Sequence, residues 1–235
     1  MFKIITQTDD FVVVAKSAGI NFHDEELQGL GLFSQVKKQM IKQADTTELY
    51  PIHRLDKMTS GLILFAKNLK SAQVFGKLFE EHHVEKYYLA ISDKKPTKKQ
   101  GLIKGDMAKS RRGMFKLLRT MNNPAITQFF SYPVANKQRL YLLRPHSGKT
   151  HQLRVALSSI GAPILGDPLY NSNSVADRGY LHAYALRFSF LGTMYQFILP
   201  SDEGEYYLSQ SVKDKLVELD QPWLLNWPKE KTRSR

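Results

Sequence analysis

The sequence predicts an α+β fold in which helices flank a mixed, largely antiparallel sheet. Short apolar segments of strand length occur along the whole chain, and several come in pairs that are separated by a polar turn. Segments with a helical spacing of apolar residues lie between these pairs, without the regular strand–helix–strand alternation of a parallel sheet. The 235 residues, 42% of them hydrophobic, suit a single catalytic domain over residues 1–235 that is built from two closely joined lobes.

The first predicted elements are two strands, FKIITQ (residues 2–7) and FVVVAK (residues 11–16), which a polar turn joins. The next element is an amphipathic helix over residues 24–43, although glycines lie near its start. The apolar residues at helical spacing are Leu27, Leu30, Phe33, Val36 and Met40, and the glycines are Gly29 and Gly31.

A buried strand and a capped helix are predicted next. GLILFAK (residues 61–67) has the length and the β-branched and aromatic content of a buried strand. Asn68 is suited to cap the following helix, which has one apolar face. That face consists of Leu69, Ala72, Phe75, Leu78 and Phe79.

The second half of the chain is dominated by predicted strands. SGKTHQLRVALSSIG (residues 147–161) predicts a loop, a helix cap, a helix and a terminal glycine. The strands are KYYLAIS (86–92), AITQFFSY (125–132), QRLYLLR (138–144), RGYLHAYALRFSFLG (178–192) and YQFILP (195–200). A last helix is predicted over residues 206–218, and the basic tail 228–235 is predicted to fray.

Composition limits the classes of function. The chain contains no cysteine, which excludes disulfides, thiolate nucleophiles and zinc sites with cysteine ligands, and agrees with a reducing compartment. Apolar runs such as LILFA are far too short to cross a bilayer, and the N-terminus does not read as a signal peptide, so we expect a cytoplasmic protein without a membrane partner. Lysine and arginine outnumber aspartate and glutamate by 34 to 22, and this surplus of +12 favours nucleic acid as the partner, ahead of an anionic membrane.

Much of the positive charge lies in residues 94–119, which we call the basic segment. It contains Lys94, Lys95, Lys98, Lys99, Lys104, Lys109, Arg111, Arg112, Lys116 and Arg119, against one acidic residue, Asp106. Two interpretations stay open: a solvated loop, or a surface that contacts RNA phosphates. In the second, Gly101, Gly105 and Gly113 allow the segment to follow a curved partner. No bulky apolar face accompanies the charges, as membrane binding would require.

Two polar turns carry the candidate reactive residues. HRLDKMTSG places His53, Arg54, Asp56, Thr59 and Ser60 at the start of the buried strand. RPHSGKTHQLR places His151 and Arg154 near the start of a predicted helix, where a spacing of three puts both side chains on one face. In EKYYLAI, strand alternation points one of Tyr87 and Tyr88 inward and the other outward.

Each of these residues also has a structural interpretation. Asp56 can stabilise a turn, His53 can be a core histidine with its hydrogen bonds satisfied, and Arg154 can be a structural ion-pair partner. Together they suggest chemistry, because a guanidinium holds a carboxylate ionised and oriented for work as a nucleophile or general base. Such a partner argues against metal binding, although His53, Asp56 and His151 supply three possible ligands.

HRLDKMTSGLILFAKN (residues 53–68) and RPHSGKTHQLRVALSSIGAPILGDPLY (residues 144–170) resemble two sequence blocks of the RluA-type pseudouridine synthases. With EKYYLA between them and YLHAYALRFSF after them, the resemblance covers roughly residues 5–200. It implies the pseudouridine synthase fold, with a central catalytic cleft between two lobes. It also implies isomerisation of a uridine in tRNA or rRNA, without a cofactor or a metal.

The resemblance assigns roles to particular residues. It implies that Asp56 is the catalytic carboxylate, that Arg154 is its ion-pair partner, and that Tyr88 contacts the target base, while Arg54 fills the space that the flipped base leaves. Substrate contacts are further expected from His53, Thr59, His151, Arg111, Arg112 and Lys116. No obligatory protein partner is evident, and Asp56 lies too near the start of this sequence to leave room for an S4 RNA-binding domain.

The sequence departs from the usual family pattern at several positions. They are Ser17 where proline is usual, Lys149 in place of arginine, Ala156 in place of histidine, and Asn171 where glycine is usual. None removes a reactive group, but they weaken any transfer of a particular RNA target. Besides the isomerase, two hypotheses stay open: an RNA-binding module of this fold without activity, and a metal-dependent nuclease.

Overall fold

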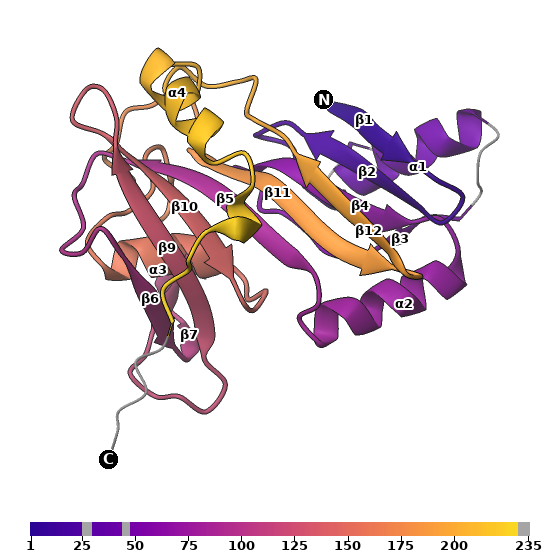
Figure 1. Ribbon diagram of the computed structural model, residues 1–235, viewed down its shortest axis with the longest axis horizontal. Coiled ribbons are helices and arrows are strands. Elements are labelled where there is room, and N and C mark those ends of the chain that lie inside the picture. Colours follow the sequence, from indigo (N-terminus) through magenta and orange to yellow (C-terminus); the bar gives the residue numbers. More distant parts are fainter. Residues whose placement is uncertain (25–29, 44–47, 230–235) are drawn as a thin grey trace. The chain divides into compact units, whose positions relative to one another are not determined.

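The chain is described by a computed structural model that covers residues 1–24, 30–43 and 48–229. It divides into two compact units (Figure 1). The first unit comprises residues 1–84 and 182–201, and the second comprises residues 85–181 and 202–235.

The first unit is built on a sheet in the order β1-β2-β4-β11, with β3 paired to β4 and β12 paired to β11. Neighbouring strands are antiparallel except for the parallel pair β4 and β11, so the predicted mixed, largely antiparallel sheet is confirmed. The strands are β1 (Phe2–Gln7), β2 (Phe11–Lys16), β3 (Tyr50–Pro51), β4 (Ser60–Ala66), β11 (Leu181–Phe190) and β12 (Thr193–Ile198).

Helix α2 (Leu69–Glu80) packs on this sheet through its apolar face. As predicted, Asn68 caps it, because the Asn68 side chain accepts a hydrogen bond from the Ser71 amide at 2.8 Å. Phe75 is fully buried and stacks on Phe190 of β11 at 4.5 Å between ring centroids. Its edge-to-face contact with Phe11 of β2, at 5.6 Å, joins the helix to a second strand, and Figure 1 shows α2 running alongside these strands.

Helix α1 (Leu32–Lys42) is shorter than the helix predicted over residues 24–43. The carboxylate of Asp24 accepts hydrogen bonds from the Gly31 amide at 2.7 Å and from the Ser34 hydroxyl at 2.8 Å, which fixes where the helix starts. A side chain at Gly31 would lie 2.4 Å from the backbone of His23, so only glycine fits there. Leu30 is 60% exposed and precedes the helix, and the predicted positions Leu27 and Gly29 lie outside the described residues.

The second unit has an antiparallel sheet in the order β5-β10-β9-β6. Its strands are β5 (Glu85–Ser92), β6 (Gln100–Gly105), β9 (Ala125–Pro133) and β10 (Arg139–Pro145). Helix α3 (Gln152–Ser159) follows β10, as the pattern of residues 147–161 predicts. Of the two adjacent tyrosines in β5, Tyr87 is buried and Tyr88 is half-buried, so they point to opposite faces as expected.

The basic segment is only partly a loop, because residues 93–99 lie outside any strand while β6 and two further short strands follow them. The choice between solvated charges and contacts with RNA stays a prediction. After β6, the strands β7 (Met107–Lys109) and β8 (Phe115–Leu117) pair antiparallel around a turn of 3-10 helix, Arg111–Gly113. We call residues 107–117 the basic hairpin. Gly105 lies where the backbone comes close, because a side chain there would lie 2.1 Å from the carbonyl oxygen of Leu118. That the glycines let the segment follow a curved partner stays a prediction.

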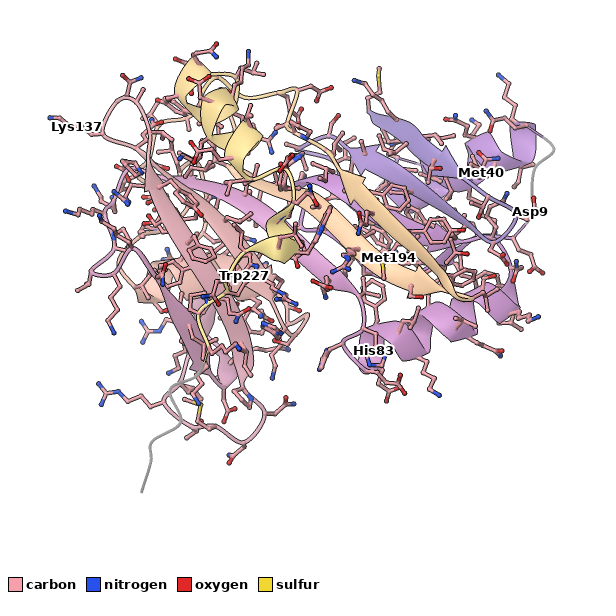
Figure 2. All side chains as sticks on the ribbon, viewed as in Figure 1. Asp9, Met40, His83, Lys137, Met194 and Trp227 are labelled. Atoms are coloured by element: carbon pink, nitrogen blue, oxygen red, sulfur yellow. The ribbon has the colours of Figure 1, made fainter. Side chains whose placement is uncertain are left out.

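The C-terminal segment is fixed to the second unit. Helix α4 (Gln210–Glu218) begins later than the predicted residue 206, and a 3-10 turn, Pro222–Leu224, follows it. Trp227, labelled in Figure 2, is buried and packs on Phe130 at 4.9 Å between ring centroids. The Gln128 side-chain amide donates to the Pro228 carbonyl at 2.7 Å, so Pro228 itself is held. Residues 230–235 of the tail that was predicted to fray lie outside the described residues.

Candidate active site

Asp56 lies in the turn between β3 and β4, in the first unit. The turn is closed by a hydrogen bond from the Thr59 amide to the Asp56 carbonyl at 3.0 Å. The side chain of Asp56 is half-buried and that of the neighbouring Arg54 is exposed. The resemblance gave these two residues the catalytic and base-replacing roles, and these roles stay predictions.

A buried lysine that the sequence analysis missed holds this turn. The Lys16 side chain is 1% exposed, and its ammonium donates to the carbonyl oxygens of Thr59 at 2.7 Å, Lys57 at 3.1 Å and Ser17 at 3.0 Å. An ammonium has three N–H donors, so these three carbonyls match its capacity. The end of β2 is thereby tied to the part of the turn that directly follows Asp56. Lys16 directly follows the apolar run FVVVA, and strands often end at a polar residue, so the sequence gave little reason to expect a buried lysine there.

The start of β4 is fixed by a second buried polar contact. His182 of β11 is 3% exposed, and its Nε2 lies 2.7 Å from the Leu199 carbonyl while its Nδ1 lies 2.7 Å from the Ser60 hydroxyl. Since a carbonyl only accepts, Nε2 donates to Leu199, which leaves Nδ1 to pair with the Ser60 hydroxyl. Ser60 follows Thr59 directly, so two buried side chains, Lys16 and His182, hold the part of the turn that leads from Asp56 into β4.

His53 and Thr59, two predicted substrate contacts, are engaged within the fold. Nε2 of His53 accepts a hydrogen bond from the Leu64 amide at 3.0 Å, and its ring stacks on Phe79 at 5.1 Å. The Thr59 side chain is 2% exposed. These contacts agree with the structural interpretation of His53 that the sequence left open, and substrate contact by either residue stays a prediction.

In the second unit, Arg154 of α3 forms a bidentate ion pair with Asp167. The distances are 2.7 Å from Nε to Oδ2 and 2.8 Å from Nη2 to Oδ1, and the two side chains are 5% and 0% exposed. Oδ1 of Asp167 also accepts from the amides of Leu169 and Tyr170, at 2.9 and 3.1 Å. Asp167 therefore fixes the plane of the guanidinium, a role that the sequence analysis did not assign to it.

His151 does not share a helical face with Arg154, contrary to the sequence prediction. It is the N-cap of α3 and has φ of 58°, in the left-handed region that residues other than glycine rarely adopt. The two side chains meet instead at Tyr170. Nδ1 of His151 lies 3.1 Å from the Tyr170 hydroxyl, and the Arg154 guanidinium lies over the Tyr170 ring at 5.1 Å.

Tyr88 pairs with Leu143 of β10 in the antiparallel register of β5. Lys86, two residues earlier, is on the same face of the strand, since side chains alternate with a period of two. Burial lowers the pKa of the Lys86 ammonium. On the opposite face, Tyr87 packs near Trp227 at 5.7 Å between ring centroids, so its ring belongs to the core.

Within residues 1–24, 30–43 and 48–229, no three histidine, aspartate or glutamate side chains are arranged to hold a metal ion. The proposed ligands His53 and His151 each direct a ring nitrogen to another group of the protein. The described part of the chain also has no helix that is long and apolar enough to span a bilayer.

Solved structures share this fold. The human RNA pseudouridylate synthase domain-containing protein 1 superposes with a TM-score of 0.72 at 22% identity, covering 94% of this chain and 95% of that one. The human domain-containing protein 4 gives a TM-score of 0.68 at 24% identity, covering 92% of each chain. The fold is therefore that of the pseudouridine synthases.

Sequence comparisons go further than the fold. The RNA pseudouridylate synthase family profile matches residues 10–159, which is more than half of the chain. An uncharacterised RNA pseudouridine synthase of Haemophilus influenzae is 44% identical, over 94% of this chain and 98% of its own length. The ribosomal large subunit pseudouridine synthase C of Rickettsia typhi is 29% identical, over 92% of this chain and 66% of its own length. The chain belongs to the RNA pseudouridylate synthase family, as an RluA-type member, and is an isomerase that acts on RNA.

Proposed function

We propose that this protein converts a particular uridine of a structured RNA, in the cytoplasm, to pseudouridine, with Asp56 as the nucleophile and both units acting as one catalytic domain. The observation that carries this proposal is the turn of Asp56, which is held from β2 by Lys16 and from β11 through His182 and Ser60. Such support is what a reactive group needs to keep a productive orientation.

The isomerisation breaks the bond between N1 of uracil and C1′ of ribose and forms a bond from C5 to C1′. The proton on C5 is removed to a base, and N1 gains a proton, so the product is an isomer of the substrate. A carboxylate nucleophile and a base are sufficient for these steps, and no external energy source is required. We assign the nucleophile to Asp56 and the contact with the base to Tyr88. The pairing of Arg154 with Asp56 comes from the family resemblance. The Asp167 ion pair supports it, because it presents the guanidinium in one orientation.

The target base is inaccessible inside a helix or stack, so the nucleotide must be flipped out at a cost of about a few kcal/mol. Arg54 is exposed and adjacent to the Asp56 turn, which suits it to occupy the vacated space. The exposed residues Arg111, Arg112 and Lys116 of the basic hairpin are proposed to contact the phosphates.

Ribosomal RNA is the first candidate substrate. The R. typhi relative is named for the large ribosomal subunit, and this chain spans about two thirds of that relative's length. Transfer RNA is the second candidate, because the reaction needs only an accessible uridine in a structured RNA.

Mapping of new pseudouridines tests the proposal. Ribosomal and transfer RNA from cells that lack this protein are incubated with it separately, and pseudouridines are located as carbodiimide adducts. A new adduct at one or a few positions, formed also in the presence of a chelator, is expected. Binding of both RNAs without any adduct would count against the proposed reaction on them and would favour the RNA-binding module without activity. RNA cleavage that the chelator stops would instead identify a metal-dependent nuclease.

A further inference from the structure

Tyr170 is in contact with three parts of the second unit, and none of these contacts was assigned a role above. Its hydroxyl accepts a hydrogen bond from the Phe115 amide, in β8 of the basic hairpin, at 2.8 Å. The same hydroxyl lies 3.1 Å from Nδ1 of His151, at the start of α3. Its ring lies under the Arg154 guanidinium at 5.1 Å, and its amide donates to Asp167 at 3.1 Å.

A hydroxyl group has one donor and two acceptor positions, so these two bonds are compatible with each other. The Tyr170 hydroxyl accepts from Phe115 and, with the neutral ring, donates to His151. The Phe115 and His151 rings also meet edge to face at 5.6 Å. The hairpin, the helix start and the tyrosine thereby form one contact cluster.

His151 adopts its left-handed backbone conformation at this cluster. Such a conformation is unfavourable for a residue with a side chain, and it persists only where surrounding contacts hold it. Here the imidazole contacts the ring of Phe115, in the basic hairpin, and the ring of Tyr170, which follows α3 in the chain.

The basic hairpin is small, and β8 lies against helix α3. Its two strands are three residues each and form a separate two-stranded sheet, and an isolated hairpin is only marginally stable in water. Its basic residues Lys109, Arg111, Arg112 and Lys116 are all exposed. A bond from the Phe115 amide to a side chain outside the hairpin therefore restricts where these charges are presented.

We propose that Tyr170 is a positioning residue that anchors the basic hairpin to the helix carrying Arg154, so that the RNA phosphates are bound in register with the reacting nucleotide. This inference rests on the proposed function, because it assumes that the hairpin contacts RNA. The hydroxyl group supplies the anchor, and the ring supplies the contact with Arg154.

Tyr170→Phe separates these two contributions. It removes the bonds to Phe115 and His151 but keeps the ring under Arg154 and the amide bond to Asp167. Tyr206→Phe is the matched control, because Tyr206 is also half-buried and its hydroxyl makes no hydrogen bond among the described residues.

The first measurement is amide hydrogen exchange at Phe115 in the full chain without RNA. Exchange is expected to accelerate in Tyr170→Phe and to stay at the parent rate in Tyr206→Phe. The second is the Kd for unmodified large-subunit ribosomal RNA transcribed in vitro, together with KM and kcat. Loss of one net hydrogen bond corresponds to a rise in Kd and KM of about three- to tenfold. A smaller change is expected in kcat.

A third measurement tests whether the hydroxyl acts through the hairpin. Replacing Arg111, Arg112 and Lys116 with Gln should weaken RNA binding less in the Tyr170→Phe background than in the parent. If Tyr170→Phe leaves the exchange rate of the Phe115 amide unchanged, Tyr170 does not anchor the hairpin. If the losses of RNA affinity from Tyr170→Phe and from the Gln triple variant are additive, the anchor does not act on RNA binding. A fall in kcat with unchanged KM would also contradict the proposal, because the Tyr170 hydroxyl would then act on the reaction through Arg154 and not on RNA binding through the hairpin. Exchange and Kd do not depend on turnover, so a parent protein that forms no pseudouridine would count against the proposed function alone.

Discussion

The Nζ atom of Lys16 lies 2.7 Å from the carbonyl oxygen of Thr59, and the same ammonium bonds the carbonyl of Lys57, so one buried cation holds the turn directly after Asp56. Few groups can replace it, because three carbonyl oxygens converge on a side chain that is 1% exposed. The backbone next to the proposed nucleophile is thus held by contacts within the first unit, which do not require bound RNA.

Lys16→Met is expected to destabilise the protein by about 3 kcal/mol, because methionine fills a similar volume but leaves buried carbonyl groups without a donor. Urea denaturation of the variant and the parent gives this difference. Lys38→Met removes the same charge from an exposed position of α1 and should change the stability by less than about 0.5 kcal/mol. Equal stabilities for Lys16→Met and the parent would show that the three bonds contribute nothing to the fold.

Asp56→Asn is expected to fold normally and to bind RNA with the parent affinity, yet to form no pseudouridine. The amide preserves the size of the side chain and removes the nucleophile. Turnover is measured by carbodiimide mapping and affinity by filter binding. Asp9→Asn, at an exposed position between β1 and β2, should have parent activity. Residual turnover of Asp56→Asn above a few per cent of the parent would contradict the assignment.

Arg154→Lys is expected to lower kcat by about a hundredfold, as misplacement of a catalytic group by a small distance does. Lysine keeps the charge but loses the two-pronged contact with Asp167 that orients the guanidinium. Asp167→Asn should also reduce kcat while its remaining oxygen still accepts from Tyr170. The two variants are compared in single-turnover assays. Near-parent activity of both would mean that the buried ion pair serves the fold and not the reaction.

Tyr88→Phe keeps a ring that can stack on the base and removes the hydroxyl. If the hydroxyl assists removal of the C5 proton, base flipping and the first covalent step should survive while formation of pseudouridine slows. Rapid quenching should therefore reveal an accumulated RNA–protein adduct. Kinetics equal to those of the parent would limit Tyr88 to stacking, and Tyr206→Phe again provides the control.

The elements that follow local rules were predicted well. The strands β1 and β2 match their predicted limits, and Asn68 caps α2 as expected, since strand alternation and helix capping depend on neighbouring residues. The strands of the basic hairpin were missed because three-residue strands rich in charge show no detectable period.

The partners in the candidate site were harder to predict. Asp56, Arg154 and Tyr88 stood out by their sequence motifs, but Lys16 and Asp167 did not. Their roles depend on which backbone and side chains the fold brings to them, across 43 residues for Lys16 and Thr59 and 13 residues for Arg154 and Asp167. His151 was misplaced for a related reason, because a helical spacing does not predict a left-handed N-cap.

The basic hairpin should control affinity for RNA through its phosphate contacts. Replacing Arg111, Arg112 and Lys116 with Gln removes up to three such contacts, each of which contributes about 0.7 to 0.9 to the slope of log affinity against log salt. Binding should weaken and the slope should become shallower by about two units. The control variant changes three lysines of α1 to Gln and therefore alters the net charge by the same amount. They are Lys37, Lys38 and Lys42, and the slope of log affinity against log salt should stay close to that of the parent. Turnover at saturating RNA should change little. The proposed contacts of the hairpin with the RNA phosphates are the same before and during the reaction, so they do not lower its barrier. An unchanged affinity and slope in the hairpin variant would mean that these charges are only solvated, and RNA selection would then have to depend on other basic residues, such as Lys229.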